Sequence, residues 1–143
     1  METAFEIINK KANPLTENRP NASREEIVGA IYRSWKNGQT KILCNDYRRV
    51  VHLVVYKNPY VGDVHVYADT DGTWDIVKAH KQFLEWFEEN SGLHKLHAGT
   101  IHPALAMMCE RTGWTFEGIR YLSSFDENGE FVDKYLYGRI RGG

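Results

Sequence analysis

The segment from residue 62 to residue 68 places a polar side chain at every second position. Asp63, His65 and Tyr67 alternate there with two valines. In a β-strand this alternation puts the three polar side chains on one face. An imidazole titrates near neutral pH, so His65 can accept a proton as a general base. The same pattern is typical of a strand whose polar face borders solvent, and both interpretations stay open.

Cys109 is a second candidate, four residues before Gly113 in an apolar segment. Leu105, Met108 and Cys109 recur at helical spacing, which favours a buried thiol that serves packing alone. A thiol with an unperturbed pKa of about 8.5 can also protonate a leaving group. Packing and acid catalysis are therefore the two interpretations that stay open for Cys109.

Two groups of residues contain the ligand types of metal sites without the required pattern. His94, His97, His102 and Cys109 match no structural or catalytic zinc spacing. Three aspartates between residues 69 and 75 lack the later Glu of a calcium loop. We therefore expect no metal.

The chain alternates strand and helix patterns that would position these side chains. Phe5 to Asn9 is a short apolar run that favours a strand, and Lys10 to Asn21 has the polar, Pro-containing composition of a long loop. Ser23 with Glu26 forms a capping-box pattern, which predicts a helix that begins there and ends at Gly38. Three strand patterns follow at residues 40–45, 49–56 and 62–68.

The second half of the chain begins with a long amphipathic pattern from Thr73, the expected cap, to Asn90. A strand is expected at residues 93–99, and Pro103 predicts a helix with His102 in the cap position. Two further strands, at residues 114–123 and 131–140, flank an Asn-Gly pair that is typical of a hairpin turn.

Composition indicates one globular domain over residues 1–143. The chain is 42% hydrophobic and 26% charged, as expected of a globular domain. A formal net charge of -1 does not favour nucleic acid as a partner. The sequence has neither a signal-peptide pattern nor an apolar run long enough for a membrane span, and it has only two cysteines. We therefore expect a cytoplasmic protein that does not associate with membranes.

Three segments in the last third of the chain carry a family resemblance. They are Leu93–Thr100, Thr112–Arg120 with its Gly-Trp and Glu-Gly pairs, and Asp126–Tyr137 with an Asp near two tyrosines. Together they resemble the C-terminal part of GNAT-type N-acetyltransferases, most closely the subgroup that acetylates protein N-termini, including those of ribosomal proteins. The expected order of elements is also similar to the GNAT order over nearly the whole chain.

The resemblance implies an α/β (α+β) fold with a mixed, mainly antiparallel sheet of six or seven strands and helices on both faces. The strands at 62–68 and 93–99 would be parallel neighbours that splay apart at one end. It also implies transfer of an acetyl group from acetyl-CoA to an amine, such as a protein N-terminus, by direct attack in a ternary complex. The protein would act as a monomer or homodimer.

Site residues follow from the same resemblance. His65, Cys109 and His102 are the catalytic candidates; Cys109 replaces a Tyr that serves as general acid in many members, and His102 replaces an Asn. The cofactor-binding candidates are Tyr67, Ala68, Gly72, Thr73 and Trp74.

The sequence departs from the family in the loop that would receive the pyrophosphate of coenzyme A. Residues 68–75 contain one glycine, no arginine and three carboxylates, where family members have a Gly/Arg-rich loop. Carboxylates would repel a pyrophosphate and weaken its binding. The alternative function is therefore a non-catalytic protein of GNAT shape that has lost coenzyme A binding.

Overall fold

The N-terminal segment of the computed structural model, which describes all 143 residues, is the helix α1 (Glu2–Lys11). The strand predicted over Phe5 to Asn9 is therefore wrong. Ala4, Ile7 and Ile8 lie at helical spacing and are fully buried, and this periodicity outweighs the β-propensity of the short apolar run. The loop that follows begins at Ala12, two residues later than expected.

The second helix, α2 (Arg24–Lys36), begins at the expected capping box. The Ser23 hydroxyl accepts a hydrogen bond from the Glu26 backbone N–H at 3.1 Å, and the Ser23 N–H donates to the Glu26 carboxylate at 3.2 Å. Each residue thereby satisfies a backbone or side-chain group of the other. This prediction is confirmed.

The remaining elements follow the expected order, with boundaries that move by one or two residues. They are β1 (Thr40–Asn45), β2 (Val50–Asn58), β3 (Val61–Ala68), α3 (Thr73–Asn90), β4 (Lys95–Thr100), α4 (Pro103–Arg111), β5 (Thr115–Phe125) and β6 (Phe131–Ile140). Gly72, not Thr73, occupies the cap position of α3, and His102 is the α4 cap residue without a side-chain capping bond. None of the helices has the length and apolarity that crossing a bilayer requires.

The six strands form one sheet in the order β1-β2-β3-β4-β6-β5. Every neighbouring pair is antiparallel except β3 and β4, which are parallel and joined by the crossover helix α3. The expected fold class, a mainly antiparallel mixed sheet with helices on both faces, is confirmed.

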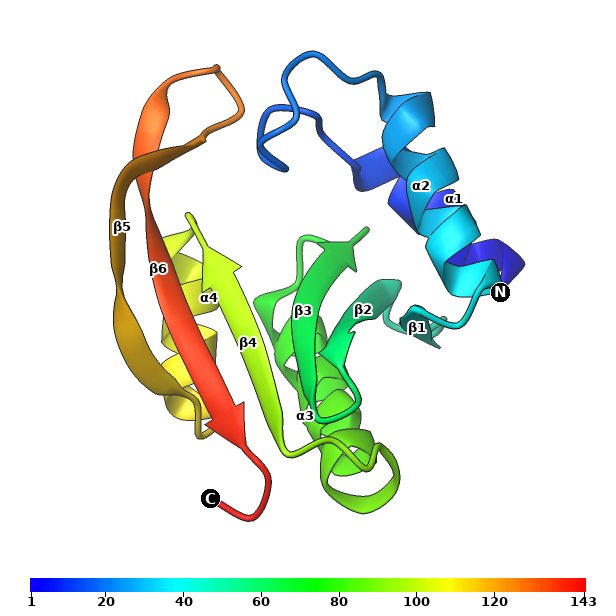
Figure 1. Ribbon diagram of the computed structural model, residues 1–143, viewed down its shortest axis with the longest axis vertical. Coiled ribbons are helices and arrows are strands. Elements are labelled where there is room, and N and C mark those ends of the chain that lie inside the picture. Colours follow the sequence, from blue (N-terminus) through cyan, green and yellow to red (C-terminus); the bar gives the residue numbers. More distant parts are fainter.

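The two parallel strands separate before they end. Their pairing runs from Val61 with Lys95 to Val64 with Ala98, whereas β3 continues to Ala68 and β4 to Thr100. Figure 1 shows the two arrowheads diverging, with the loop between α1 and α2 above the opening. The predicted splay is confirmed, and it leaves unpaired strand edges at the centre of the sheet.

Each face of the sheet has its own hydrophobic core. Val54, Phe87 and Leu96 belong to the core beneath α3 and α4. Ile7, Ile27 and Val51 belong to the core beneath α1 and α2, which cover the β1–β3 side of the sheet (Figure 1). On the α1 side, the face of β4, β6 and β5 carries the charged side chains of Lys95, Glu117 and Lys134 beside two glycines and Leu136.

Candidate active site

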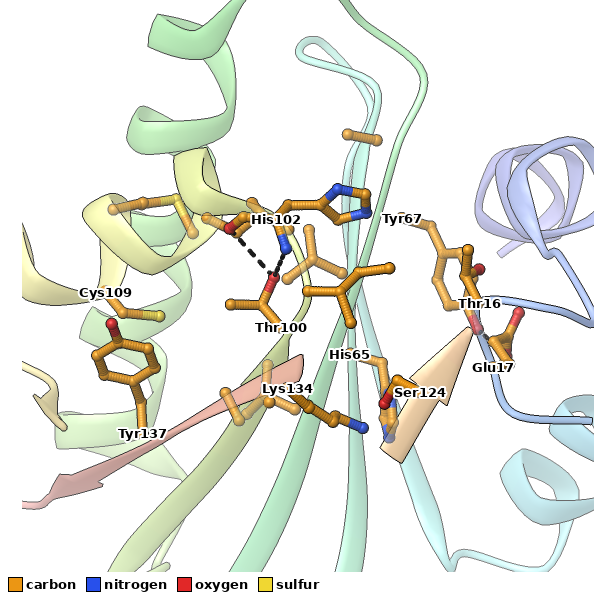
Figure 2. Close-up of a pocket in the computed structure, with 18 of the residues that line it drawn as sticks. Thr16, Glu17, His65, Tyr67, Thr100, His102, Cys109, Ser124, Lys134 and Tyr137 are labelled. Carbon is orange, nitrogen blue, oxygen red and sulfur yellow. Dashed lines mark hydrogen bonds between the residues drawn. The ribbon is translucent and has the colours of Figure 1, made fainter. Parts of the chain in front are cut away.

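A cavity of about 420 Å³ lies where β3 and β4 separate. Its walls come from the α1–α2 loop, β3, β4, the start of α4, β5 and β6. Because the opening passes between two strands, residues from both faces of the sheet line the same space. His65 and Tyr67 enter from the α1 side, and Cys109 enters from the α4 side (Figure 2).

His65 is the titratable ring on the α1 side of this cavity. The ring is accessible from the cavity, but the surrounding walls limit its hydration, and this desolvation lowers the pKa of His65 below its ordinary value. The charge of Lys134 acts in the same direction, whereas Asp63 and Glu17 oppose it. His65 is therefore neutral at pH 7, the state in which an imidazole can accept a proton.

The α1–α2 loop closes the cavity through Glu17. The Tyr67 hydroxyl donates to one Glu17 carboxylate oxygen at 2.8 Å, and the Asn13 backbone N–H donates to the other at 3.1 Å. Burial and the neighbouring carboxylate raise the pKa of Tyr67 far above its ordinary value. The Tyr67 side chain thus serves the loop rather than the cofactor side, and only its backbone lies on the splayed strand edge.

Cys109 and Tyr137 form the opposite wall. Cys109 is 5% exposed, and burial together with the charge of Glu110 raises the pKa of its thiol to about 11. Tyr137 donates to the Glu110 carboxylate at 3.1 Å, and burial with that bond raises its pKa to about 12. Both groups are protonated at neutral pH, so each has a proton to donate.

A chain of buried rings supports this wall from behind. The Trp114 indole N–H donates to His80 Nε2 at 3.0 Å, so His80 Nε2 is an acceptor and its proton is on Nδ1. His80 Nδ1 lies 3.0 Å from His52 Nε2 and donates to it. Burial lowers the pKa of both histidines, that of His80 to about 4. Trp114 and His80 line the cavity, and His52 fixes them to β2.

His102, the third catalytic candidate, lies at the rim of the cavity. Its ring is 47% exposed, with Nε2 3.5 Å from a carboxylate oxygen of Glu127. Its backbone N–H donates a hydrogen bond to the Thr100 hydroxyl oxygen at 3.0 Å (Figure 2). The structure thus brings His65 and Cys109 into one cavity and puts His102 at its entrance.

The loop before α3 differs from the sequence expectation in its electrostatics. Asp69 is bound by Lys10 at 2.9 Å and by Arg49 at 3.0 Å, and the Arg48 guanidinium binds Asp75 at 2.7 Å. Lys10 and Arg49 keep the pKa of Asp69 below its ordinary value. Asp71 alone of the three expected repelling carboxylates has no cationic partner. The prediction that all three would repel a phosphate is therefore incomplete.

Backbone donors are available beside these ion pairs. The N–H groups of Thr73 and Trp74 make no hydrogen bond within the protein, as is usual in the first turn of a helix. Trp74 is 62% exposed, and its ring is covered by the ammonium groups of Lys78 and Lys81 at 5.3 and 5.9 Å. Gly72, Thr73 and Trp74 lie outside the cavity, whereas Tyr67 and Ala68 line it.

Several residues of the site could not be predicted because no local sequence pattern indicates them. Glu17 and Lys134 are single polar residues in a loop and a hairpin, and only the fold brings them to β3. Arg48 and Arg49 lie some twenty positions before the loop they neutralise. Trp114 follows a helix-ending glycine, a signal that indicates burial but not its bond to His80. No group of three or more His, Cys, Asp or Glu side chains is arranged to hold a metal ion.

Comparison with solved structures identifies the fold. A variant of spermidine N-acetyltransferase SpeG from Vibrio cholerae matches with a TM-score of 0.73 and 12% identity, over 98% of this chain and 91% of that one. Ribosomal-protein-S5-alanine acetyltransferase from Vibrio fischeri matches with a TM-score of 0.63 and 15% identity, over 82% and 70%. RimL, a ribosomal L7/L12 α-N-protein acetyltransferase, matches with a TM-score of 0.64 and 16% identity, over 82% of this chain and 79% of that one.

These matches are to acetyltransferases, and at such low identity they establish the fold alone. No protein-family model matches the sequence, and no curated protein is significantly similar to it in sequence. The chain therefore has the fold of GNAT N-acetyltransferases, in agreement with the resemblance in its C-terminal third.

Proposed function

We propose that the protein is an N-acetyltransferase that moves an acetyl group from acetyl-CoA to an amine, such as a protein N-terminus, by direct attack in a ternary complex. The observation that carries the proposal is one cavity with His65 on one side of the splayed sheet and Cys109 on the other. The solved structures of this fold are named for acetylation of spermidine and of ribosomal proteins, which supports an amine as the acceptor.

The residues around the splay fit acetyl-CoA. The edge of β3 from His65 to Ala68 has no β4 partner, so its backbone is open to the amides of the pantetheine arm. The free N–H groups of Thr73 and Trp74, at the positive end of α3, would receive the pyrophosphate. Acetyl-CoA, when bound, supplies an activated acyl group.

The reaction forms a C–N bond, breaks the thioester C–S bond, and requires two proton transfers. His65 takes the proton from the attacking amine, since its lowered pKa keeps it neutral at pH 7. Cys109 gives a proton to the departing sulfur, since its raised pKa keeps the thiol protonated, and it regains that proton from solvent through the cavity. His102, at the rim beside Glu127, would orient the acceptor as it enters.

We place this reaction in the cytoplasm, in keeping with two free cysteines. The first test is calorimetric titration of the protein with acetyl-CoA and with CoA, followed by mass spectrometry of a panel of amines incubated with acetyl-CoA. We expect binding of both and acetylation of at least one amine class. Absence of heat and of any thermal shift at millimolar ligand would contradict the proposal and leave a non-catalytic protein of the same fold.

A further inference from the structure

Two cations lie opposite each other on the uncovered sheet face beside the cavity. Arg120 on β5 and Lys134 on β6 are direct cross-strand partners in the sheet register. Like charges in this relation repel each other and destabilise a sheet. Arg120 is exposed to solvent, whereas Lys134 is half-buried, so Lys134 is the cation of the pair whose hydration is limited.

Lys134 reaches the cavity because the neighbouring strand has a glycine. A Cβ on Gly99 would lie 2.5 Å from Cε of Lys134, so the glycine leaves the space through which this side chain crosses β4. Figure 2 shows the side chain extending toward His65 and Ser124. Its ammonium group thus lies on the same side of the splay as the proposed base.

Neither cation has a direct ionic partner within the protein. Neither Lys134 nor Arg120 makes an ion pair or a side-chain hydrogen bond. The carboxylates of this region are engaged elsewhere: Asp63 with Lys57 at 3.1 Å, Glu117 with Lys95, and Glu17 with Tyr67. Burial, and the charge of Arg120 after it, lower the pKa of Lys134, and the charge of Asp63 offsets only part of this shift.

We propose that Lys134, supported by Arg120, binds a carboxylate of the amine acceptor. The acceptor is then an amine that carries a carboxylate a few bonds from its nitrogen, either an acidic N-terminal residue of a peptide or a free amino acid. A polyamine would bring further positive charge against this pair. This inference rests on the proposed acetyl transfer and names the class of its substrate.

The test compares acceptors that differ in one charge. We expect kcat/KM to be at least about tenfold higher for the peptide Asp-Ala-Ala-amide than for Asn-Ala-Ala-amide, and higher than for spermidine. Free aspartate, assayed beside the Asp peptide, distinguishes an amino acid from a peptide substrate. Lys134→Gln should abolish the preference, Lys134→Arg should retain most of it, and Arg120→Gln should reduce it. Lys41→Gln, an exposed lysine on β1, is the matched control and should change nothing.

A second readout does not depend on catalysis. Calorimetry without acetyl-CoA should detect N-acetyl-Asp-Ala-amide, the product type, and much weaker binding of the Asn analogue, with the difference lost in Lys134→Gln. Equal binding of the two analogues, or a preference for spermidine, would overturn the inference even if acetyl transfer is observed. If no amine is acetylated but the protein still binds the Asp analogue more tightly than the Asn analogue, the proposed function is overturned and the inference about Lys134 is not. Lys134→Gln should melt at the same or a higher temperature, because it relieves repulsion from Arg120.

Discussion

At the scale of single residues, His65 is the position where a small change should affect turnover most. His65→Gln removes the proton acceptor but keeps a polar side chain of similar reach, so kcat should fall by about 10²- to 10⁴-fold with little change in KM. The pKa of His65 is lowered, so the wild-type kcat should rise with pH along a curve whose midpoint lies below 6.5, and it should be level at higher pH. Steady-state kinetics from pH 5 to 8 check both statements.

His97 provides the control for this substitution. It lies on the same sheet face, 3.8 Å from Asp63, but does not line the cavity. His97→Gln should leave kcat and its pH profile unchanged. Equal losses in the two variants would show that His65 does not act as a specific base.

Cys109 separates acid catalysis from packing. Cys109→Ala removes the proton donor, and kcat should fall on the order of 10²-fold while the affinity for acetyl-CoA is retained. Cys44→Ala, at the other free thiol, should leave kcat unchanged. Full turnover in Cys109→Ala together with a lower melting temperature would assign Cys109 to the core alone, with Tyr137 or a solvent water as the acid.

At the scale of elements, the α1–α2 loop is a wall of the cavity, and hydrogen bonds to the β5–β6 hairpin hold it in place. Asn18, in a left-handed conformation with φ of 55°, accepts from the Phe125 N–H at 3.2 Å and donates to the Ser123 carbonyl at 3.3 Å. Asn18→Gly keeps the backbone conformation and removes both bonds. We expect a loss of about 1–2 kcal/mol in the free energy of unfolding and a higher KM for the acceptor, with unchanged acetyl-CoA affinity.

Denaturant unfolding and initial-rate kinetics measure these two effects. Asn37→Gly, in the turn after α2, is a matched Asn-to-Gly change remote from the cavity and should leave the acceptor KM unaltered. An unchanged acceptor KM in Asn18→Gly would mean that the loop does not form the acceptor wall.

The first turn of α3 yields a prediction about charge. Asp71 is exposed and unpaired beside the free N–H groups, so Asp71→Asn should tighten acetyl-CoA binding about two- to fivefold at low salt. The gain should shrink as salt screens the repulsion. Glu89→Gln, the same charge change at the far end of α3, should have no effect. Weaker binding in Asp71→Asn would place the phosphates away from this turn.

At the scale of the whole molecule, buried histidines make global stability depend on pH. The pKa of His80 is about 4 in the folded state and near 6.5 when unfolded, so only the unfolded chain is protonated between these values. The free energy of unfolding should therefore fall as pH drops from 6.5 toward 4, by up to about 3 kcal/mol from His80 alone. His52 adds a change of the same sign.

Denaturant titrations at pH 7 and pH 4.5 measure this loss. His80→Gln should lose less stability between the two pH values than the wild type, and the exposed control His94→Gln should lose as much as the wild type.

We also propose that residues 1–143 form one domain, since both cores share a single sheet. Fluorescence and circular dichroism should then report one coincident transition, and two separate transitions would contradict it.

Sequence patterns predicted the elements whose periodicity is long or whose boundaries carry a chemical signal. The capping box at Ser23, the long apolar stripe of α3 and the Asn-Gly turn are local, so they could be read directly. The pattern over Phe5 to Asn9 predicts a strand wrongly because a run of five residues is too short to distinguish a strand from a helix. The helical spacing of Ala4, Ile7 and Ile8 extends beyond that run, and α1 packs this face against α2 and the sheet.

The candidate site could be predicted only where the residues lie on elements with a readable alternation. His65 follows from the period of β3, and Cys109 from its place in α4. The partners of these residues depend on tertiary contacts. The Glu17–Tyr67 bond joins positions fifty apart, and the Lys134 path depends on Gly99 in another strand. The same holds for the arginines that neutralise Asp69 and Asp75.

The bond from Trp114 to His80 gives this protein a built-in optical signal. Trp114 lines the cavity and stacks on His80 with ring centroids 5.8 Å apart, so its emission should respond both to an occupant and to protonation of the imidazole. With Trp35, Trp74 and Trp86 replaced by phenylalanine, Trp114 would be the one remaining tryptophan, and it could be excited selectively. Substrate arrival could then be followed in real time without a label attached to either molecule.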